Sequence, residues 1–133
     1  MRKIDKFYEN TQNAKPHKNV IEFLNIQKKS SNAIDLGCGT GRDTILLIEN
    51  NWKVLAIARE NVEQRILSKL DENQITNLEF LQQEFEQLIL KKNDLIVANY
   101  SLPFCNENDF YKLWHKIVDS INPGRIFCRK LLW

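Results

Sequence analysis

The sequence predicts an α/β fold: a doubly wound parallel sheet of about five strands with helices on both faces. Three mostly apolar runs, at residues 33–36, 54–57 and 94–99, have the length and composition of buried parallel strands. Segments with apolar residues at helical spacing separate these runs, as in chains that build a parallel sheet. Three glycines spaced two apart, Gly37, Gly39 and Gly41, follow the first run directly.

The first half of the chain is expected to alternate helix and strand. Residues 1–15 are polar and are expected to form a loosely docked leader, so the folded domain spans residues 16–133. Pro16 favours the start of a helix, which ends near residues 28–29. The elements predicted next are a strand at 33–36, a helix over 44–48, a strand at 54–57 and a helix over 62–70 with Asn61 as its N-cap.

The second half continues the same alternation. Residues 78–81 and 94–99 predict two further strands. A long helix follows, capped by Asn108 or Asp109, and its apolar stripe is interpreted as core. Residues 122–124, Asn-Pro-Gly, predict a turn into a fifth strand that begins at Arg125 and runs to Leu132.

Composition limits the classes of partner. The 133 residues are enough for one domain with a single core, and 43% hydrophobic and 27% charged residues are ordinary for a globular chain. The net charge of +2 comes from dispersed lysines and arginines, which gives no reason to expect a nucleic acid partner. No apolar run approaches the ~20 residues of a membrane span, and the basic N-terminus lacks the apolar region of a signal peptide.

The cysteines and histidines indicate no metal site. Cys38, Cys105 and Cys128 are far apart and odd in number, so we interpret them as reduced thiols of a cytoplasmic protein. His17, in the first turn of the first helix, is interpreted as a surface residue rather than a catalytic one.

The glycine turn is the strongest indication of a ligand site. Glycine permits positive φ and lets a ligand approach the backbone, and the following helix points free N–H groups into the same space. Asp35, at the end of the preceding strand, suits an ammonium partner. A dinucleotide site needs the pattern G-x-G-x-x-G, but counting from Gly37 its third glycine falls on Arg42. The spacing therefore disfavours a nicotinamide cofactor.

Residues 34–41, Ile-Asp-Leu-Gly-Cys-Gly-Thr-Gly, resemble the first motif of class I S-adenosylmethionine-dependent methyltransferases, which have a Rossmann-like fold. Within that class the chain looks closest to the small-molecule methyltransferases of the tellurite-resistance type. The resemblance implies S-adenosylmethionine as cofactor, a small-molecule methyl acceptor, and Asp35 as the partner of the cofactor's amino group. It also implies that the loop with Gly37, Cys38, Gly39 and Gly41 passes beneath the cofactor.

Two further stretches carry the resemblance. Residues 99–104 resemble the fourth motif, beside the transferred methyl, which makes Asn99, Tyr100 and Ser101 the candidates for assisting the reaction and Asn99 a candidate for holding the cofactor. Residues 84–86 resemble the acidic pair at the adenine edge, so Glu84 is expected to accept from the exocyclic amine, with Phe85 beside it. In this family N-terminal segments often fold over the cofactor, a role open to Tyr8 or Thr11.

The chain departs from the family pattern in two places. Ala58 stands where the family has an acid that holds the ribose hydroxyls, and Glu60 either compensates or is held in an ion pair by Arg59. The family sheet has seven strands in the order 3-2-1-4-5-7-6, whereas this chain stops at Trp133, so we expect it to lack the last two strands. The edge of strand 5 is then expected to be exposed, which favours self-association. The alternative is a truncated or degenerate domain with weak or no catalysis, which acts as a binding module or is a non-functional fragment.

Overall fold

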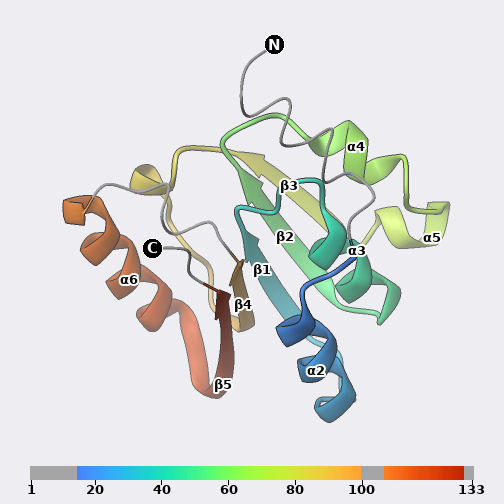
Figure 1. Cartoon of the computed structure of the whole chain (residues 1–133), viewed down its shortest axis with the longest axis horizontal. Helices are drawn as coiled ribbons and strands as arrows, with labels where there is room; N and C mark the ends of the chain where they lie inside the picture. Colours follow the sequence, from blue (N-terminus) through green and yellow to red (C-terminus); the bar gives the residue numbers. More distant parts are fainter. Residues whose placement is uncertain (1–14, 100–106, 131–133) are drawn as a thin grey trace.

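The computed structural model describes residues 15–99 and 107–130 and forms one parallel sheet in the order β3-β2-β1-β4-β5 (Figure 1). The strands are β1 Asn32–Leu36, β2 Lys53–Ala58, β3 Leu78–Gln82, β4 Asn93–Asn99 and β5 Ile121–Lys130. The helices are α2 Lys18–Ile26, α3 Arg42–Glu49, α4 Glu63–Leu67, α5 Glu72–Ile75 and α6 Glu107–Ser120, with a short 3-10 helix η1 at Phe85–Gln87. The predicted α/β fold with a doubly wound parallel sheet is confirmed.

Helices cover both faces of the sheet, and the two-residue period of the strands decides which side chains each face receives. On one face α2, α3 and α4 pack against Ala33 of β1, alternate residues of β2, and Leu95 and Val97 of β4. On the other face α6 and η1 pack against Ile34 and Leu36 of β1 and their counterparts in β2 and β4. Asp35 is two residues after Ala33, and Asn99 is two residues after Val97. Their side chains therefore lie on the face of the sheet that α2 and α3 cover.

Two boundaries differ from the sequence prediction because local capping was misjudged. The predicted helix over residues 62–70 is two short helices, since Asp71 starts α5 with a capping box in which its carboxylate accepts from the backbone N–H groups of Asn73 and Gln74. The expected caps Asn108 and Asp109 are also wrong, because α6 begins at Glu107. No helix in the described parts of the chain is long and apolar enough to cross a bilayer.

The predicted turn at residues 122–124 is absorbed into β5. Asn93 of β4 pairs with Ile121, and Leu95 pairs with Ile126, so residues 122–125 face a single residue of β4. Asp94, that single residue, accepts a hydrogen bond from Asn122 at 2.9 Å and another from Ser31. The Asn-Pro-Gly sequence at residues 122–124 therefore marks an irregularity in the pairing of β4 with β5, and not the start of β5.

The glycine loop joins β1 to α3 with all three glycines at positive φ: 76° at Gly37, 58° at Gly39 and 87° at Gly41. The third glycine has a second reason to be glycine. A Cβ at Gly41 would lie 2.5 Å from Cγ1 of Ile66, a buried residue of α4. Gly41 therefore allows α4 to pack directly against the start of α3.

We expect Gly41→Ala to lower the free energy of unfolding by about 1–3 kcal/mol, because the methyl group overlaps Ile66 and the residue keeps a left-handed conformation. Chemical denaturation of Gly41→Ala, Ile66→Ala and the double variant measures the contact. The double variant should lose less free energy of unfolding than the two single variants lose together, because Ile66→Ala removes the atoms that overlap the new methyl group. Strictly additive losses would contradict the proposed contact.

Candidate active site at the carboxyl edge of the sheet

Asp35 lies at the carboxyl end of the central strand and is buried, with 2% of its surface exposed. Its side chain turns toward α3, where the hydroxyl of Thr44 donates to Oδ2 at 2.6 Å. Ligands of open α/β sheets bind outside this edge, where the strand order reverses on either side of β1. Asp35 is therefore placed at the expected ligand site, beside the glycine loop.

The backbone of the loop is tied to the neighbouring strand. The N–H groups of Gly37 and Cys38 both donate to the carbonyl of Ile57, at 2.8 and 3.0 Å, and Gly41 N–H donates to the carbonyl of Cys38. These bonds attach the start of the loop to the end of β2 and close a turn within the loop. The Cys38 side chain is buried and not in a disulfide. Burial and the nearby charge of Asp35 raise the pKa of this thiol, so it remains protonated.

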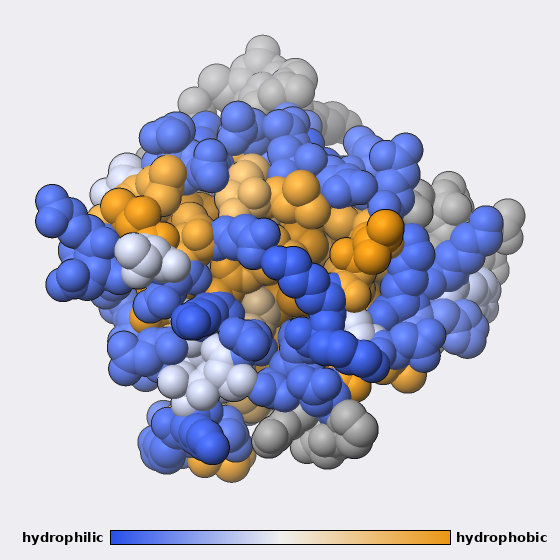
Figure 2. Space-filling model, turned by 180° about the vertical axis from the view of Figure 1, so that it is seen from behind, coloured by the Kyte–Doolittle hydropathy of each residue, from blue (hydrophilic) through white to orange (hydrophobic). Residues whose placement is uncertain are grey.

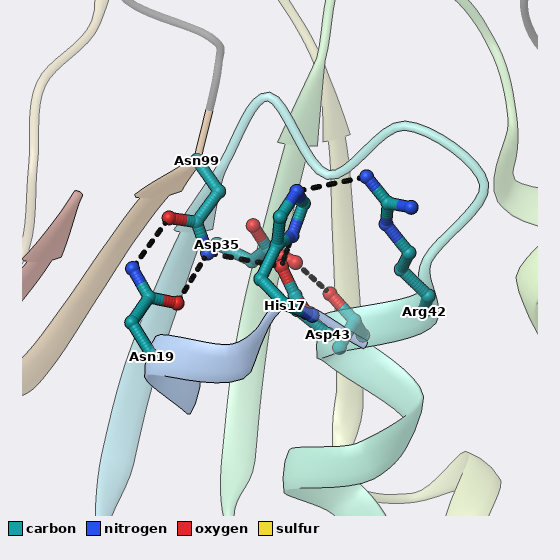
Figure 3. Close-up of polar contacts among 7 residues, drawn as sticks. His17, Asn19, Asp35, Arg42, Asp43 and Asn99 are labelled. Carbon is teal, nitrogen blue, oxygen red and sulfur yellow. Dashed lines mark hydrogen bonds and ion pairs between the residues drawn. The ribbon is translucent and has the colours of Figure 1, made fainter. Parts of the chain in front are cut away.

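A second buried carboxylate, Asp43 in the first turn of α3, is held by donors from two other elements (Figure 3). The backbone N–H of His17 donates to Oδ1 at 2.8 Å, and Nδ1 of the same residue lies 2.7 Å from Oδ2. The amide of Asn99 donates to Oδ2 at 3.2 Å. Nη2 of Arg42 lies 2.8 Å from Nε2 of His17. A guanidinium only donates, so Nε2 accepts and Nδ1 carries the proton.

The interpretation of His17 as a surface residue is wrong. Only 11% of its side chain is exposed, and both its backbone and its ring contact Asp43, which lies 26 positions away in the sequence. The apolar spacing of α3 is the one feature of the sequence that could have identified Asp43 as a buried residue. Leu47 and Ile48 are buried on α3, and one turn earlier the same face presents Asp43 and Thr44. No local pattern identified His17 as its partner.

The two carboxylates have opposite pKa shifts. Burial and then the negative charge of Asp43 raise the pKa of Asp35 to about 7, although Thr44 and Arg42 act in the other direction. Burial would also raise the pKa of Asp43, but the hydrogen bonds from His17 and Asn99 outweigh it, so the pKa of Asp43 is lowered. The site without a ligand therefore holds Asp43 ionised, whereas Asp35 keeps its proton below about pH 7.

Asn99, the last residue of β4, has its amide group engaged by protein partners. Its Oδ1 accepts from Asn19 at 2.7 Å, and its Nδ2 donates to Asn19 Oδ1 at 3.0 Å as well as to Asp43. These contacts attach α2 to the edge of the sheet. Tyr100 and Ser101, the other two candidates for catalysis, lie outside the described residues, as do Tyr8 and Thr11.

The ends of β2 and β3 form the other flank of the site. Ala58 is the last residue of β2 and is buried, which places it at the edge as expected, and Glu60 is partly buried two positions further on. Arg59 forms an ion pair with Glu84, with Nε and Oε2 3.2 Å apart. Its guanidinium also lies 5.5 Å from the centroid of the Phe85 ring. This ion pair engages Glu84, the residue that is predicted to contact the adenine edge.

Phe85 is 2% exposed and belongs to the core beneath α6. A hollow of about 270 Å³ lies elsewhere, at the amino ends of β1 and β2, and is lined by residues such as Asn32 and Lys53. It includes neither Asp35 nor the glycine loop. Among the described residues no group of three His, Cys, Asp or Glu side chains is arranged to hold a metal ion.

Comparison with known proteins agrees with this geometry. Residues 27–129 match the family described as "Methyltransferase domain". The carboxy-S-adenosyl-L-methionine synthase of Cronobacter sakazakii is 26% identical over 101 residues, which cover 71% of this chain and 41% of the synthase.

Two solved structures share the fold. TehB from Haemophilus influenzae superposes with a TM-score of 0.76 at 20% identity, over 95% of this chain and 44% of TehB. The glycopeptide N-methyltransferase MtfA, in complex with S-adenosyl-L-methionine, gives a TM-score of 0.73 at 20% identity, over 86% of this chain and 54% of MtfA. The chain thus spans about half the length of the relatives it matches.

We expect Asp35→Asn to stabilise the ligand-free protein, and to do so more at pH 8 than at pH 5. The native state keeps a proton on Asp35 up to about pH 7, whereas an unfolded Asp loses it near its ordinary pKa of 3.8. Stability therefore falls as the pH rises between these values, and asparagine removes that loss. The gain at pH 8 should be at least about 1 kcal/mol.

Thermal and urea unfolding across this pH range measure the effect. Asp119→Asn is the matched control, because Asp119 is exposed on α6 and its removal should give no such pH dependence. An equal effect of Asp35→Asn at both pH values would contradict the raised pKa of Asp35.

Proposed function

The chain belongs to the methyltransferase domain family, and we propose that it binds S-adenosylmethionine and transfers the methyl group to a small-molecule acceptor. The observation that carries this proposal is the buried Asp35 beside a glycine loop with three positive φ angles. A buried carboxylate suits an ammonium group, and the loop leaves room for a ligand against the backbone. The solved complexes of MtfA with S-adenosyl-L-methionine and S-adenosyl-L-homocysteine are consistent with the same ligand.

Such a reaction asks little acid–base chemistry of the protein. The nucleophile of the acceptor attacks the methyl carbon, the carbon–sulfur bond breaks, and its electron pair returns to sulfur, which loses its positive charge. The protein aligns the two reactants and excludes water. Asn99 is predicted to lie beside the transferred methyl group, and its bonds to Asn19 and Asp43 favour a role in holding the edge of the site in shape.

A second candidate function is a binding module with weak or no catalysis, and Ala58 favours it. Its methyl group cannot accept the ribose hydroxyls, and a lost hydrogen bond to a charged group costs ~1.5–3 kcal/mol. Glu60, two residues after Ala58, is the candidate replacement for the missing acid. We also propose a cytoplasmic location, on the basis of the thiol of Cys38, which is buried and not in a disulfide.

Isothermal titration calorimetry with S-adenosylmethionine and S-adenosylhomocysteine tests the proposed function. We expect both to bind, with an affinity that rises with pH up to about 7, because an ammonium group binds the ionised form of Asp35. Asp35→Asn should weaken binding at least about tenfold. Gly39→Val should abolish binding, since a branched residue does not tolerate the φ of 58° and blocks the approach of the ligand.

The outcomes separate the two candidates. Absence of binding at millimolar ligand would overturn both the cofactor and the transfer reaction. Binding without formation of S-adenosylhomocysteine from a panel of small amines, thiols and hydroxyl compounds would favour the binding module. The control Asp119→Asn should bind as the unmodified chain does, because Asp119 lies on α6, away from the carboxyl edge.

We further propose that the 133-residue chain self-associates through the edge of β5. In the described part of the chain β5 pairs only with β4, and its sequence includes the apolar residues Ile126 and Phe127. Unpaired strand edges favour pairing with another chain. Figure 2 shows apolar residues gathered in the middle of the face seen from behind, with hydrophilic residues around and across them. Sedimentation velocity at micromolar concentration should therefore detect species larger than a monomer, and a single monomer boundary would refute the association.

A further inference from the structure

The N-terminal end of α2 is connected to the first turn of α3 by His17, which precedes the helix as its N-cap residue. Its backbone N–H and its Nδ1 each contact a different oxygen of Asp43, at 2.8 and 2.7 Å. The side chains of the pair are 11% and 6% exposed. Such a two-point contact fixes both the position and the orientation of the Asp43 carboxylate (Figure 3).

A second connection closes a ring through the sheet. Asn19 of α2 exchanges two hydrogen bonds with Asn99 of β4, and Asn99 donates to Asp43. The three elements are far apart in the sequence, since Asn19 and Asn99 are separated by 80 positions and Asn99 and Asp43 by 56. Asp43 therefore accepts hydrogen bonds from three donors, and its negative charge acts on Asp35.

We propose that His17 is a positioning residue of the cofactor site: its two contacts hold the Asp43 carboxylate beside Asp35, so that a cationic amino group binds Asp35 in place of a proton. This inference rests on the proposed function for the identity of the ligand, but not for the behaviour of the two carboxylates. The site then binds a cationic amino group with release of one proton to solvent, and a neutral ligand group gains nothing from Asp35.

The charged groups around Asp35 support this order of ionisation. Two neighbouring buried carboxylates do not both ionise without a cation, and the one with more donors takes the charge. Asp43 has three donors, and Asp35 has two, the hydroxyl and the backbone N–H of Thr44. Arg42 of α3 is the cation that acts on Asp35, and its Nη2 is directed to Nε2 of His17. Cys38 of the loop is neutral, and β4 presents the uncharged Asn99.

The test follows the carboxyl carbons of Asp35 and Asp43 by carbon-13 NMR during a pH titration of the ligand-free protein. In Asp43→Asn the midpoint of Asp35 should fall by about one pH unit or more, because the neighbouring charge is gone. In His17→Ala the midpoint of Asp43 should rise, because two of its donors are weakened or lost. In His17→Asn the Asp43 midpoint should stay close to that of the unmodified chain, because the asparagine amide nitrogen replaces Nδ1.

A second experiment adds the ligand. Calorimetry with S-adenosylmethionine in two buffers of different ionisation enthalpy measures the number of protons released on binding. The unmodified chain should release close to one proton on binding at pH 6, and Asp43→Asn distinctly less. His17→Ala should also release distinctly less than one proton, because Asp43 is then no longer held beside Asp35, and His17→Asn should restore the release. His115→Ala is the matched control, because His115 is exposed on α6, and it should change neither the midpoints nor the affinity.

An unchanged Asp35 midpoint in Asp43→Asn, or an unchanged Asp43 midpoint in His17→Ala, would overturn the proposal and leave the pair a purely structural contact. If His17→Ala does not fold, Asp43→Asn and His17→Asn decide the question. Shifted midpoints in a protein that does not bind S-adenosylmethionine would support the coupling of the carboxylates while overturning the proposed function.

Discussion

The arrangement at the carboxyl edge depends on one constraint, the burial of two neighbouring carboxyl groups, Asp35 and Asp43. Asp35 and Asp43 are 2% and 4% exposed, and a charge on one opposes a charge on the other. α2, α3 and β4 each contribute a polar group to this place: His17, Thr44 and Asn99. A protein selected for stability alone would not retain a carboxyl group at position 35, so its presence is itself an argument for a ligand.

Most of the fold was predictable because its signals are local. Continuous apolar runs located β1, β2 and β4, and the alternation of strand and helix required parallel pairing. The place of Asp35 was also predictable, because a polar residue that ends a buried strand next to a glycine turn has few structural uses. The boundary errors came from caps, where Asp71 begins a new helix within a segment whose apolar spacing continues.

The tertiary part of the site was not predictable from these signals. The contacts of His17 to Asp43 and of Asn19 to Asn99 join segments that no periodicity relates. The packing reason for Gly41 required the position of Ile66, which depends on how α4 crosses the start of α3. Side-chain roles at the ends of β2 and β3 were likewise indeterminate, since whether Arg59 would pair with Glu60 or Glu84 depends on loop geometry.

The central position of β1 has a consequence for the order of folding. Its first partner, β2, follows soon in the chain, but its other partner, β4, begins only at Asn93. The pairing of Ala33 with Leu95 therefore requires that the chain has been synthesised beyond Leu95. Contacts between distant segments form late because a long loop must close first. During synthesis the β1–β2–β3 half therefore forms with one side of β1 open, and α2 lacks its anchor until Asn99 emerges from the ribosome. The site is therefore completed only once β4 has joined β1, and until then the open side of β1 is an unpaired strand edge.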